Sequence, residues 1–169
     1  MVGLRNLRSF ASLSLQLAIL AVLIAAFFVR TPQVSGPSME PHIISGEYVL
    51  INTLAYRLHA PSRGDVVAFR HDGDVPETFI KRVIGLPGDR IAVDRGTVIL
   101  NGVPLREPYV RYADARSFPE VTVPPNDVYV LGDNRANSED SRFFGAVPDA
   151  DLMGRALWGI WPLGAIGAL

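Results

Sequence analysis

The hydrophobic pattern divides the chain into two parts. Residues 9–29 form a run of 21 residues without a charged side chain. As an α-helix this run is about 31 Å long, close to the hydrocarbon thickness of a bilayer. From residue 30 onward, apolar residues come in short runs separated by proline and glycine. The pattern therefore predicts one N-terminal transmembrane helix followed by a mostly β domain over residues 30–163.

The apolar run has two interpretations, an uncleaved anchor and a cleaved signal peptide. Both begin with basic residues and have an apolar centre. The run is long for a signal peptide, and residues 27–29 are bulky (FFV) where a cleavage site would need small side chains, so we favour an anchor. The two arginines before it predict that residues 1–8 are cytoplasmic and that the β domain lies outside. Arg30, directly after the run, weakens this orientation slightly.

Short apolar runs in the second part have the length and composition of strands, and turn sequences such as HDGD, LPGD and PPND separate them. Two of the runs flank Asp94-Arg95-Gly96, which predicts a hairpin. Residues 54–58 predict a short helical turn. The expected fold class is mostly β, with folded antiparallel sheets or a partial barrel. The predicted strands cover residues 47–52, 65–70, 79–85, 90–94, 97–102 and 127–133.

Two segments do not fit the strand pattern. Residues 103–125 are polar and proline-containing and predict a small peripheral segment or flap. The C-terminal stretch 156–169 is apolar, contains two tryptophans and is short for a membrane span. It predicts either a last strand with a loosely packed end at 164–169, or contact with the membrane interface, where tryptophan is favoured.

Composition excludes several classes of function. The net charge of −1 and the absence of a basic stripe argue against a nucleic-acid partner. The chain has no cysteine, so disulfides and thiolate nucleophiles are excluded. The three histidines lack a metal-ligand spacing. We expect no metal and no cofactor.

Lys81 is the only lysine among sixteen basic residues. Arginine stays protonated in proteins, whereas a desolvated lysine can lose its proton and act as a base. In a strand, Phe79 and Val83 share the face of Lys81 and would desolvate its amine. A lone lysine is more often a solvated surface charge, and Arg82 has apolar neighbours too, so this pattern alone leaves both interpretations open.

Two other segments are candidates for the chemistry. SGPSMEPH, residues 35–42, contains Ser38 in an unusual Pro/Gly context just after the predicted anchor. By composition alone it is an ordinary linker. GDNRANSEDSRFFG, residues 132–145, is a dense polar loop after a strand. It is either a surface loop with local turns or a set of side chains that supports a site.

Together these segments resemble bacterial type I signal peptidases. The motifs occur in the order of that family: a membrane segment, GPSMEP, RGDVVAFR, KRVIGLPGD and GDNRANSEDSRFFGAV. The resemblance extends from about residue 17 to residue 163 and is closest to the compact members with one membrane span.

The resemblance implies a Ser–Lys dyad, with Ser38 as the nucleophile and Lys81 as the general base. Ser138 matches the serine that orients the lysine. At Gly36 we expect a main-chain contribution to oxyanion binding. Three more positions match the family: Asp140 and Arg142 as a structural pair, and Met39 as a residue of the substrate groove.

The implied function is a serine endopeptidase that removes signal peptides from exported preproteins and cuts after small residues at −1 and −3. Its expected partners are preprotein signal peptides and the lipid bilayer, and it would act as a monomer on the outer face of the bacterial plasma membrane. Three alternatives remain. They are a self-cleaving Ser–Lys protein, an inert membrane-tethered β domain, and a Ser–His hydrolase that uses one of the histidines His42, His59 and His71.

Overall fold

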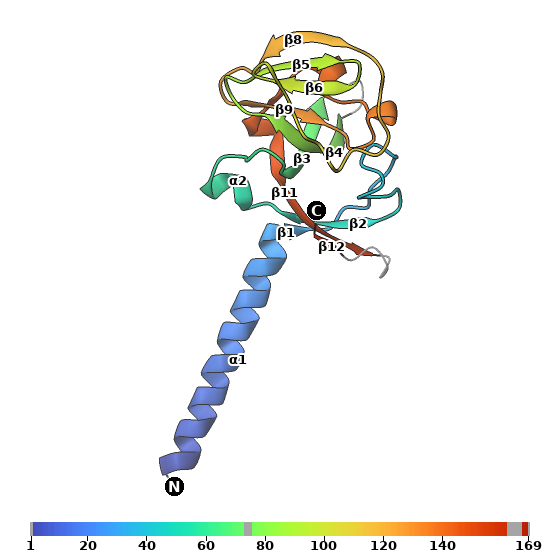
Figure 1. Cartoon of the computed structure of the whole chain (residues 1–169). Coiled ribbons are helices and arrows are strands. Elements are labelled where there is room, and N and C mark those ends of the chain that lie inside the picture. The colour runs from blue at the N-terminus through green and yellow to red at the C-terminus, as the bar shows by residue number, and fades with distance from the viewer. Residues whose placement is uncertain (1, 73–75, 162–166, 169) are drawn as a thin grey trace.

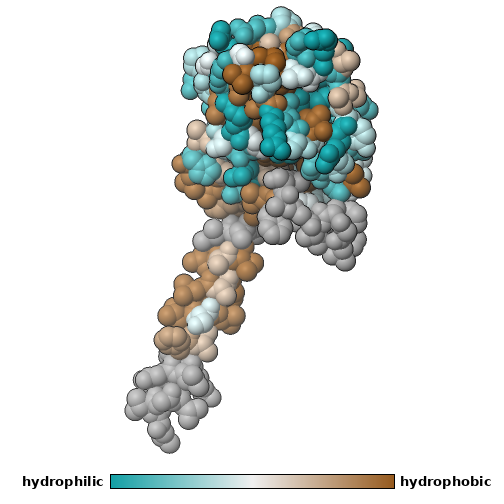
Figure 2. Space-filling model, in the orientation of Figure 1, coloured by the Kyte–Doolittle hydropathy of each residue, from teal (hydrophilic) through white to brown (hydrophobic). Residues whose placement is uncertain are grey.

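The protein, described from a computed structural model, consists of one long helix and a β domain (Figure 1). The structure describes residues 2–72, 76–161 and 167–168. Helix α1 (Val2–Phe28) leaves the β domain at one end. Eight of its large apolar side chains, between Phe10 and Leu23, are exposed, and they form an apolar rod below a more hydrophilic domain (Figure 2).

The predicted transmembrane helix is therefore a helix, but its role as a membrane span is not confirmed. Within the residues that the structure describes, no helix meets the combined length and hydropathy needed to cross a bilayer.

The main sheet contains eight antiparallel strands in the order β1-β2-β11-β3-β4-β9-β10, with β12 beside β11. Helix α2 (Ala55–Leu58) follows β2 and confirms the predicted helical turn. The strands of this sheet are β1 (Val29–Arg30), β2 (Tyr48–Asn52), β3 (Val66–Asp72), β4 (Pro76–Gly85), β9 (Asp127–Leu131), β10 (Val147–Pro148), β11 (Leu152–Trp161) and β12 (Gly167–Ala168).

A second, four-stranded antiparallel sheet lies at the end of the domain away from α1 (Figure 1). The predicted hairpin is confirmed, since Asp94 pairs with Thr97 across a two-residue turn at Arg95 and Gly96. Both turn residues have positive φ, 45° and 84°, as a tight hairpin turn requires. The strand order is β7-β6-β5-β8, formed by β5 (Arg90–Asp94), β6 (Thr97–Leu100), β7 (Val103–Pro104) and β8 (Phe118–Thr122).

The expectation of a mostly β, antiparallel fold is thus confirmed. Apolar side chains from both sheets form a shared core that includes Ile84, Ile91, Val98 and Leu131. Residues 103–125 are more structured than expected, because β7 and β8 add to the two edges of the β5–β6 hairpin. The first half of the C-terminal stretch lies in β11, which pairs with both β2 and β3. Residues 162–166 and 169 lie outside the described residues, so the expectation for the apolar end stays a prediction.

Three short helical turns complete the chain: η1 (Arg135–Asn137), α3 (Ser141–Phe144) and η2 (Asp149–Asp151). The first two belong to the polar loop after β9. That loop, β4 and the turn around Ser38 meet at one place in the fold.

Candidate active site

Ser38 and Lys81 are in direct contact. Lys81 Nζ donates a hydrogen bond to Ser38 Oγ at 2.8 Å, across 43 positions of sequence. Lys81 lies in β4, and Ser38 lies in a turn where Glu40 N–H donates to Pro37 O and Ile43 N–H donates to Met39 O. The fold therefore places a serine hydroxyl against a lysine amine.

Lys81 is only 4% exposed, and the Phe79 ring centroid lies 4.9 Å from its Nζ. Burial lowers the pKa of the ammonium from its ordinary 10.5 to about 8, because desolvation disfavours the charged form. Asp140 and Glu139 oppose this shift by attraction to the charge. Near neutral pH, an appreciable fraction of this amine is therefore free to accept a proton.

The backbone of Ser38 is held by the polar loop. Its carbonyl accepts a hydrogen bond of 3.0 Å from Asn134 N–H. Among the described residues, no group accepts a hydrogen bond from the Ser38 N–H. The Gly36 N–H, by contrast, donates to Ser45 Oγ at 3.2 Å, and Gly36 has a φ of 93°. In this arrangement the Ser38 amide is open while the Gly36 amide is already engaged.

Gly132 allows the loop to approach this closely, and the sequence patterns did not single it out. A Cβ at this position would lie 2.3 Å from Ser138 Oγ and 2.5 Å from the Ser38 carbonyl oxygen. Distances this short are not possible without movement of one loop. The glycine directly after a strand, in GDN, is the only signal that could have indicated it.

Ser138 is close to the dyad, but no hydrogen bond joins it to Lys81 among the described residues. Its Oγ is buried and has no hydrogen-bond partner there. Buried hydroxyls without a partner are rare in folded proteins, and a catalytic role is one of the reasons for which they occur. The role of Ser138 in orienting the lysine stays a prediction.

Asp140 and Arg142 are paired, with Arg142 Nε donating to Asp140 Oδ1 at 2.8 Å and Nη2 to Oδ2 at 2.9 Å. Asp140 is fully buried and also accepts from Gly132 N–H. The pair thus connects the end of β9 to helix α3.

The peripheral segment supplies further partners, which sequence reasoning missed. Arg142 Nη1 donates to Asp114 Oδ2 at 2.9 Å, and Arg135 donates to both carboxylate oxygens of Glu107 at 2.6 and 3.0 Å. A parallel bridge between Tyr112 and Asn134 adds a backbone link. Residues 103–125 therefore support the polar loop from the side.

Met39, next to Ser38, is 1% exposed and packs in a core with Val49, Ile51 and Val66. It lies beneath the Ser38 turn rather than on an open surface. Its place in a substrate groove stays a prediction.

The contacts of His42 and His71 are with residues other than Ser38. His42 Nδ1 lies 3.3 Å from Asp133 Oδ2, and Asp133 is held by two hydrogen bonds from Arg82. His71 stacks on Phe79, with ring centroids 4.9 Å apart. Among the described residues, no histidine forms a hydrogen bond with Ser38.

Comparisons with known proteins give one consistent result. The family model described as "Signal peptidase, peptidase S26" matches residues 7–161. The chain is 39% identical to a probable signal peptidase I-2 of Synechocystis sp. over 156 residues, which cover 89% of this chain and 72% of that protein. It is 39% identical to the signal peptidase I of Bacillus caldolyticus, with 76% of this chain and 78% of that protein covered.

Among solved structures, the chain is similar to the crystal structure of a signal peptidase I from Enterococcus faecalis. The two are 34% identical, and the match covers 56% of this chain and 95% of the other with a TM-score of 0.49. The matched family model and the curated relatives show that the chain belongs to the signal peptidase family, peptidase S26, and is a serine endopeptidase.

Proposed function

We propose that this enzyme removes signal peptides from exported preproteins, with Ser38 as the nucleophile and Lys81 as the general base. The observation that carries the proposal is the 2.8 Å contact between Ser38 Oγ and a buried lysine amine whose pKa is lowered to about 8. A neutral amine at this distance can accept the hydroxyl proton directly.

The reaction has two steps. Lys81 takes the proton of Ser38 Oγ while the oxygen attacks the scissile carbonyl carbon, and the amine then passes that proton to the leaving nitrogen. The peptide bond breaks and an ester to Ser38 remains. The mature-side product leaves with its new amino terminus. In the second step Lys81 takes a proton from water, and the hydroxide attacks the ester carbonyl. The bond to Ser38 Oγ then breaks, Lys81 returns the proton to Ser38 Oγ, and the signal peptide is released with a free carboxyl group.

The developing oxyanion needs hydrogen-bond donors. We assign the Ser38 N–H as one donor because nothing in the described structure accepts its hydrogen bond. Gly36 can contribute its own N–H only if the bond to Ser45 Oγ opens. Ser138 is assigned the task of orienting the neutral amine, since its buried hydroxyl is unpaired.

Strand β4 offers a place for the substrate. Residues Pro76–Arg82 pair with β3 on one side, whereas β9 pairs with β4 only from Arg82 onward. Among the described residues, no strand covers the β9 side of residues 76–81. A preprotein segment can add here as a strand, which puts its −1 and −3 side chains on one face. Two shallow pockets on that face would then select small residues.

We further propose that α1 anchors the enzyme in the bacterial plasma membrane, with its N-terminus in the cytoplasm and the β domain outside. The exposed apolar side chains of α1 support this, because water is a poor environment for so continuous an apolar surface. Ser38 and Lys81 come from one chain, so a monomer holds the whole dyad.

The test is cleavage of a purified preprotein in detergent micelles, with the N-terminus of the product sequenced. Wild type should cut after a small −1 residue, and preproteins with leucine at −1 should be cut at least about a hundredfold more slowly, because a shallow pocket cannot hold the larger side chain. Folded Ser38→Ala should not cut. Cleavage by Ser38→Ala, or no cleavage by wild type, would contradict the proposal.

A further inference from the structure

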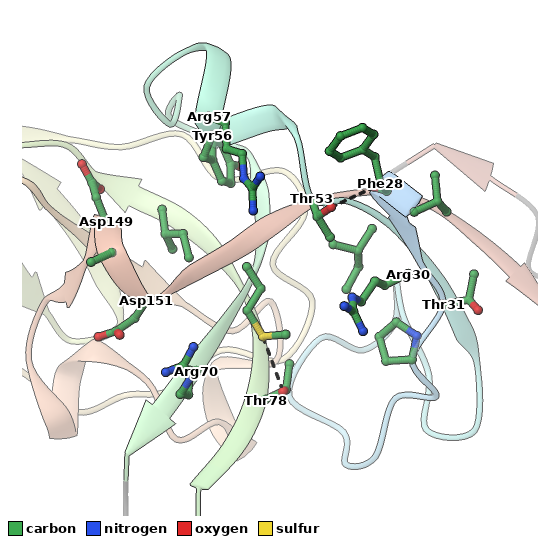
Figure 3. A pocket seen from close by; sticks show the side chains of 16 residues that line it. Phe28, Arg30, Thr31, Thr53, Tyr56, Arg57, Arg70, Thr78, Asp149 and Asp151 are labelled. Atoms are coloured by element: carbon green, nitrogen blue, oxygen red, sulfur yellow. Dashed lines mark hydrogen bonds between the residues drawn. The ribbon is translucent and has the colours of Figure 1, made fainter. Parts of the chain in front are cut away.

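One cavity among the described residues lies away from Ser38 and Lys81. It has a volume of about 1160 Å³ and lies where α1 joins the β domain, and neither Ser38 nor Lys81 lines it. Its walls come from the end of α1, β1, α2 and the outer parts of β3, β4 and β11 (Figure 3). A cavity of this size can hold a small molecule or a lipid headgroup.

Three arginines from three separate elements line this cavity: Arg30 from β1, Arg57 from α2 and Arg70 from β3. All three are exposed. None of them has an ion pair or a side-chain hydrogen bond with another described residue. Arginines of the described part of the chain form nine ion pairs with carboxylates, and none of these pairs includes a cavity arginine.

Two acidic residues also line the cavity, Asp149 and Asp151, and both stand away from Arg30 and Arg57 in Figure 3. Neither lies within ion-pair distance of a cavity arginine. Burial, and then repulsion from Asp127, raises the pKa of Asp149. The cavity lining therefore holds three arginines against two aspartates, an excess of one positive charge.

The position of the cavity indicates the source of its ligand. Phe28, the last residue of α1, and Val29, the first of β1, form part of the wall. Thr53 fixes this junction by donating to the Phe28 carbonyl from both its N–H and its Oγ1. With α1 embedded in a bilayer, the wall of the cavity at the end of α1 is at the level of the lipid headgroups. Basic residues beside a membrane helix are usually on the cytoplasmic side, and Arg30 is an exception to this rule. A phosphate ligand in the cavity would explain its position.

We propose that this cavity binds the phosphate group of an anionic phospholipid and thereby docks the β domain on the membrane surface. Guanidinium groups bind phosphate oxygens in pairs of charge-assisted hydrogen bonds. Basic pockets beside membrane helices bind such headgroups. The inference rests on the membrane tether proposed above, but it does not depend on the catalytic roles of Ser38 and Lys81.

The test uses the full chain in maltoside micelles and short-chain dihexanoyl lipids, with binding measured by calorimetry. The cavity variant carries Arg30→Gln, Arg57→Gln and Arg70→Gln. A matched control carries Arg95→Gln, Arg106→Gln and Arg111→Gln, which removes three exposed arginines that do not line the cavity. Thermal unfolding confirms that both variants are folded. Ser38→Ala serves as a third protein, and it should bind lipid like wild type even if the peptidase assignment fails.

Wild type and the control should bind phosphatidylglycerol alike, and the cavity variant should bind it at least about tenfold more weakly, because charge-assisted hydrogen bonds are lost. Phosphatidylcholine should bind weakly to all of them. Equal phosphatidylglycerol binding by the two triple variants would overturn the proposal. If the cavity variant alone then showed a raised KM for preprotein, the cavity would belong to the substrate path. Inorganic phosphate binding as tightly as phosphatidylglycerol would mean a site for free phosphate, which also overturns the lipid assignment.

Discussion

Asp114 and Arg142 form an ion pair of 2.9 Å that joins the peripheral segment to the polar loop beside the dyad. Arg142 is 2% and Asp114 is 9% exposed in this pair, and the same guanidinium also binds Asp140. The polar loop contains Ser138, and its Asn134 N–H binds the Ser38 carbonyl. This loop is therefore positioned by a segment that contributes neither Ser38 nor Lys81.

Asp114→Asn should weaken this support. Loss of the charge leaves a buried guanidinium with one carboxylate fewer, which should cost about 1–3 kcal/mol of unfolding free energy. The rate of cleavage should fall as the loop becomes less ordered. Chemical denaturation and preprotein cleavage measure the two effects. Asp94→Asn is the matched control, because its 3.6 Å pair with Arg95 is exposed and should matter little. Equal behaviour of the two variants would show that the peripheral segment does not position the loop.

Gly132→Ala should separate the nucleophile from the polar loop. The added methyl would clash with both Ser138 Oγ and the Ser38 carbonyl, and a shift of about 1 Å at a reacting group can cost a hundredfold in rate. The measurement is kcat/KM for a preprotein, corrected for the folded fraction.

Gly154→Ala provides the control for a general packing defect. Its methyl would lie 2.4 Å from the Asn52 carbonyl oxygen, in β11 and away from the dyad. It should lower stability but leave the activity of each folded molecule nearly intact. Similar activity losses in the two variants would remove the special role of Gly132.

The pH dependence of cleavage should report the titration of Lys81. The folded-state pKa is depressed to about 8, so the neutral, active amine is present above that pH and is lost as the pH falls below it. We expect log(kcat/KM) to rise with a slope near one up to about pH 8 and then level off. A pH–rate profile that levels off only near pH 10, the pKa of an unperturbed lysine, would show that burial does not lower the pKa of Lys81.

His42→Gln tests the Ser–His alternative. Asp133 keeps its two hydrogen bonds from Arg82 when the imidazole is removed, and a half-exposed His–Asp contact contributes at most about 1 kcal/mol. The rate of cleavage should therefore stay within about fivefold of wild type, because a change of about 1 kcal/mol in activation free energy alters a rate by that factor. A loss of several orders of magnitude, with the fold intact, would make His42 the base.

Local sequence patterns predicted those parts of the fold that depend on near neighbours. The β5–β6 hairpin follows from a tight turn at Arg95 and Gly96, and the strands around it follow from alternating burial, as in β5. Strand β8 was missed because Pro119 and Glu120 give it the composition of a loop, and most of it is exposed. Strand β11 was only half anticipated, because its pairing with β2 joins segments about a hundred residues apart and leaves no local pattern.

The site shows the same division. A lone lysine between apolar neighbours indicated a possible base, but only the resemblance of several motifs connected it to Ser38. The ion pairs of Asp114 and Glu107 each span 28 residues. The sequence around a carboxylate in a polar segment does not indicate which distant arginine it will pair with. These two ion pairs could therefore not be predicted.

The most direct test of the Ser–Lys assignment is cleavage of one preprotein by wild type and by Lys81→Arg, side by side in detergent micelles. Arginine preserves the positive charge but cannot give up its proton at working pH. We predict a folded variant whose kcat/KM is at least about a thousandfold lower, in line with the loss of a general base and of nucleophile activation. Cleavage by Lys81→Arg at nearly the wild-type rate would show that Lys81 is not the base.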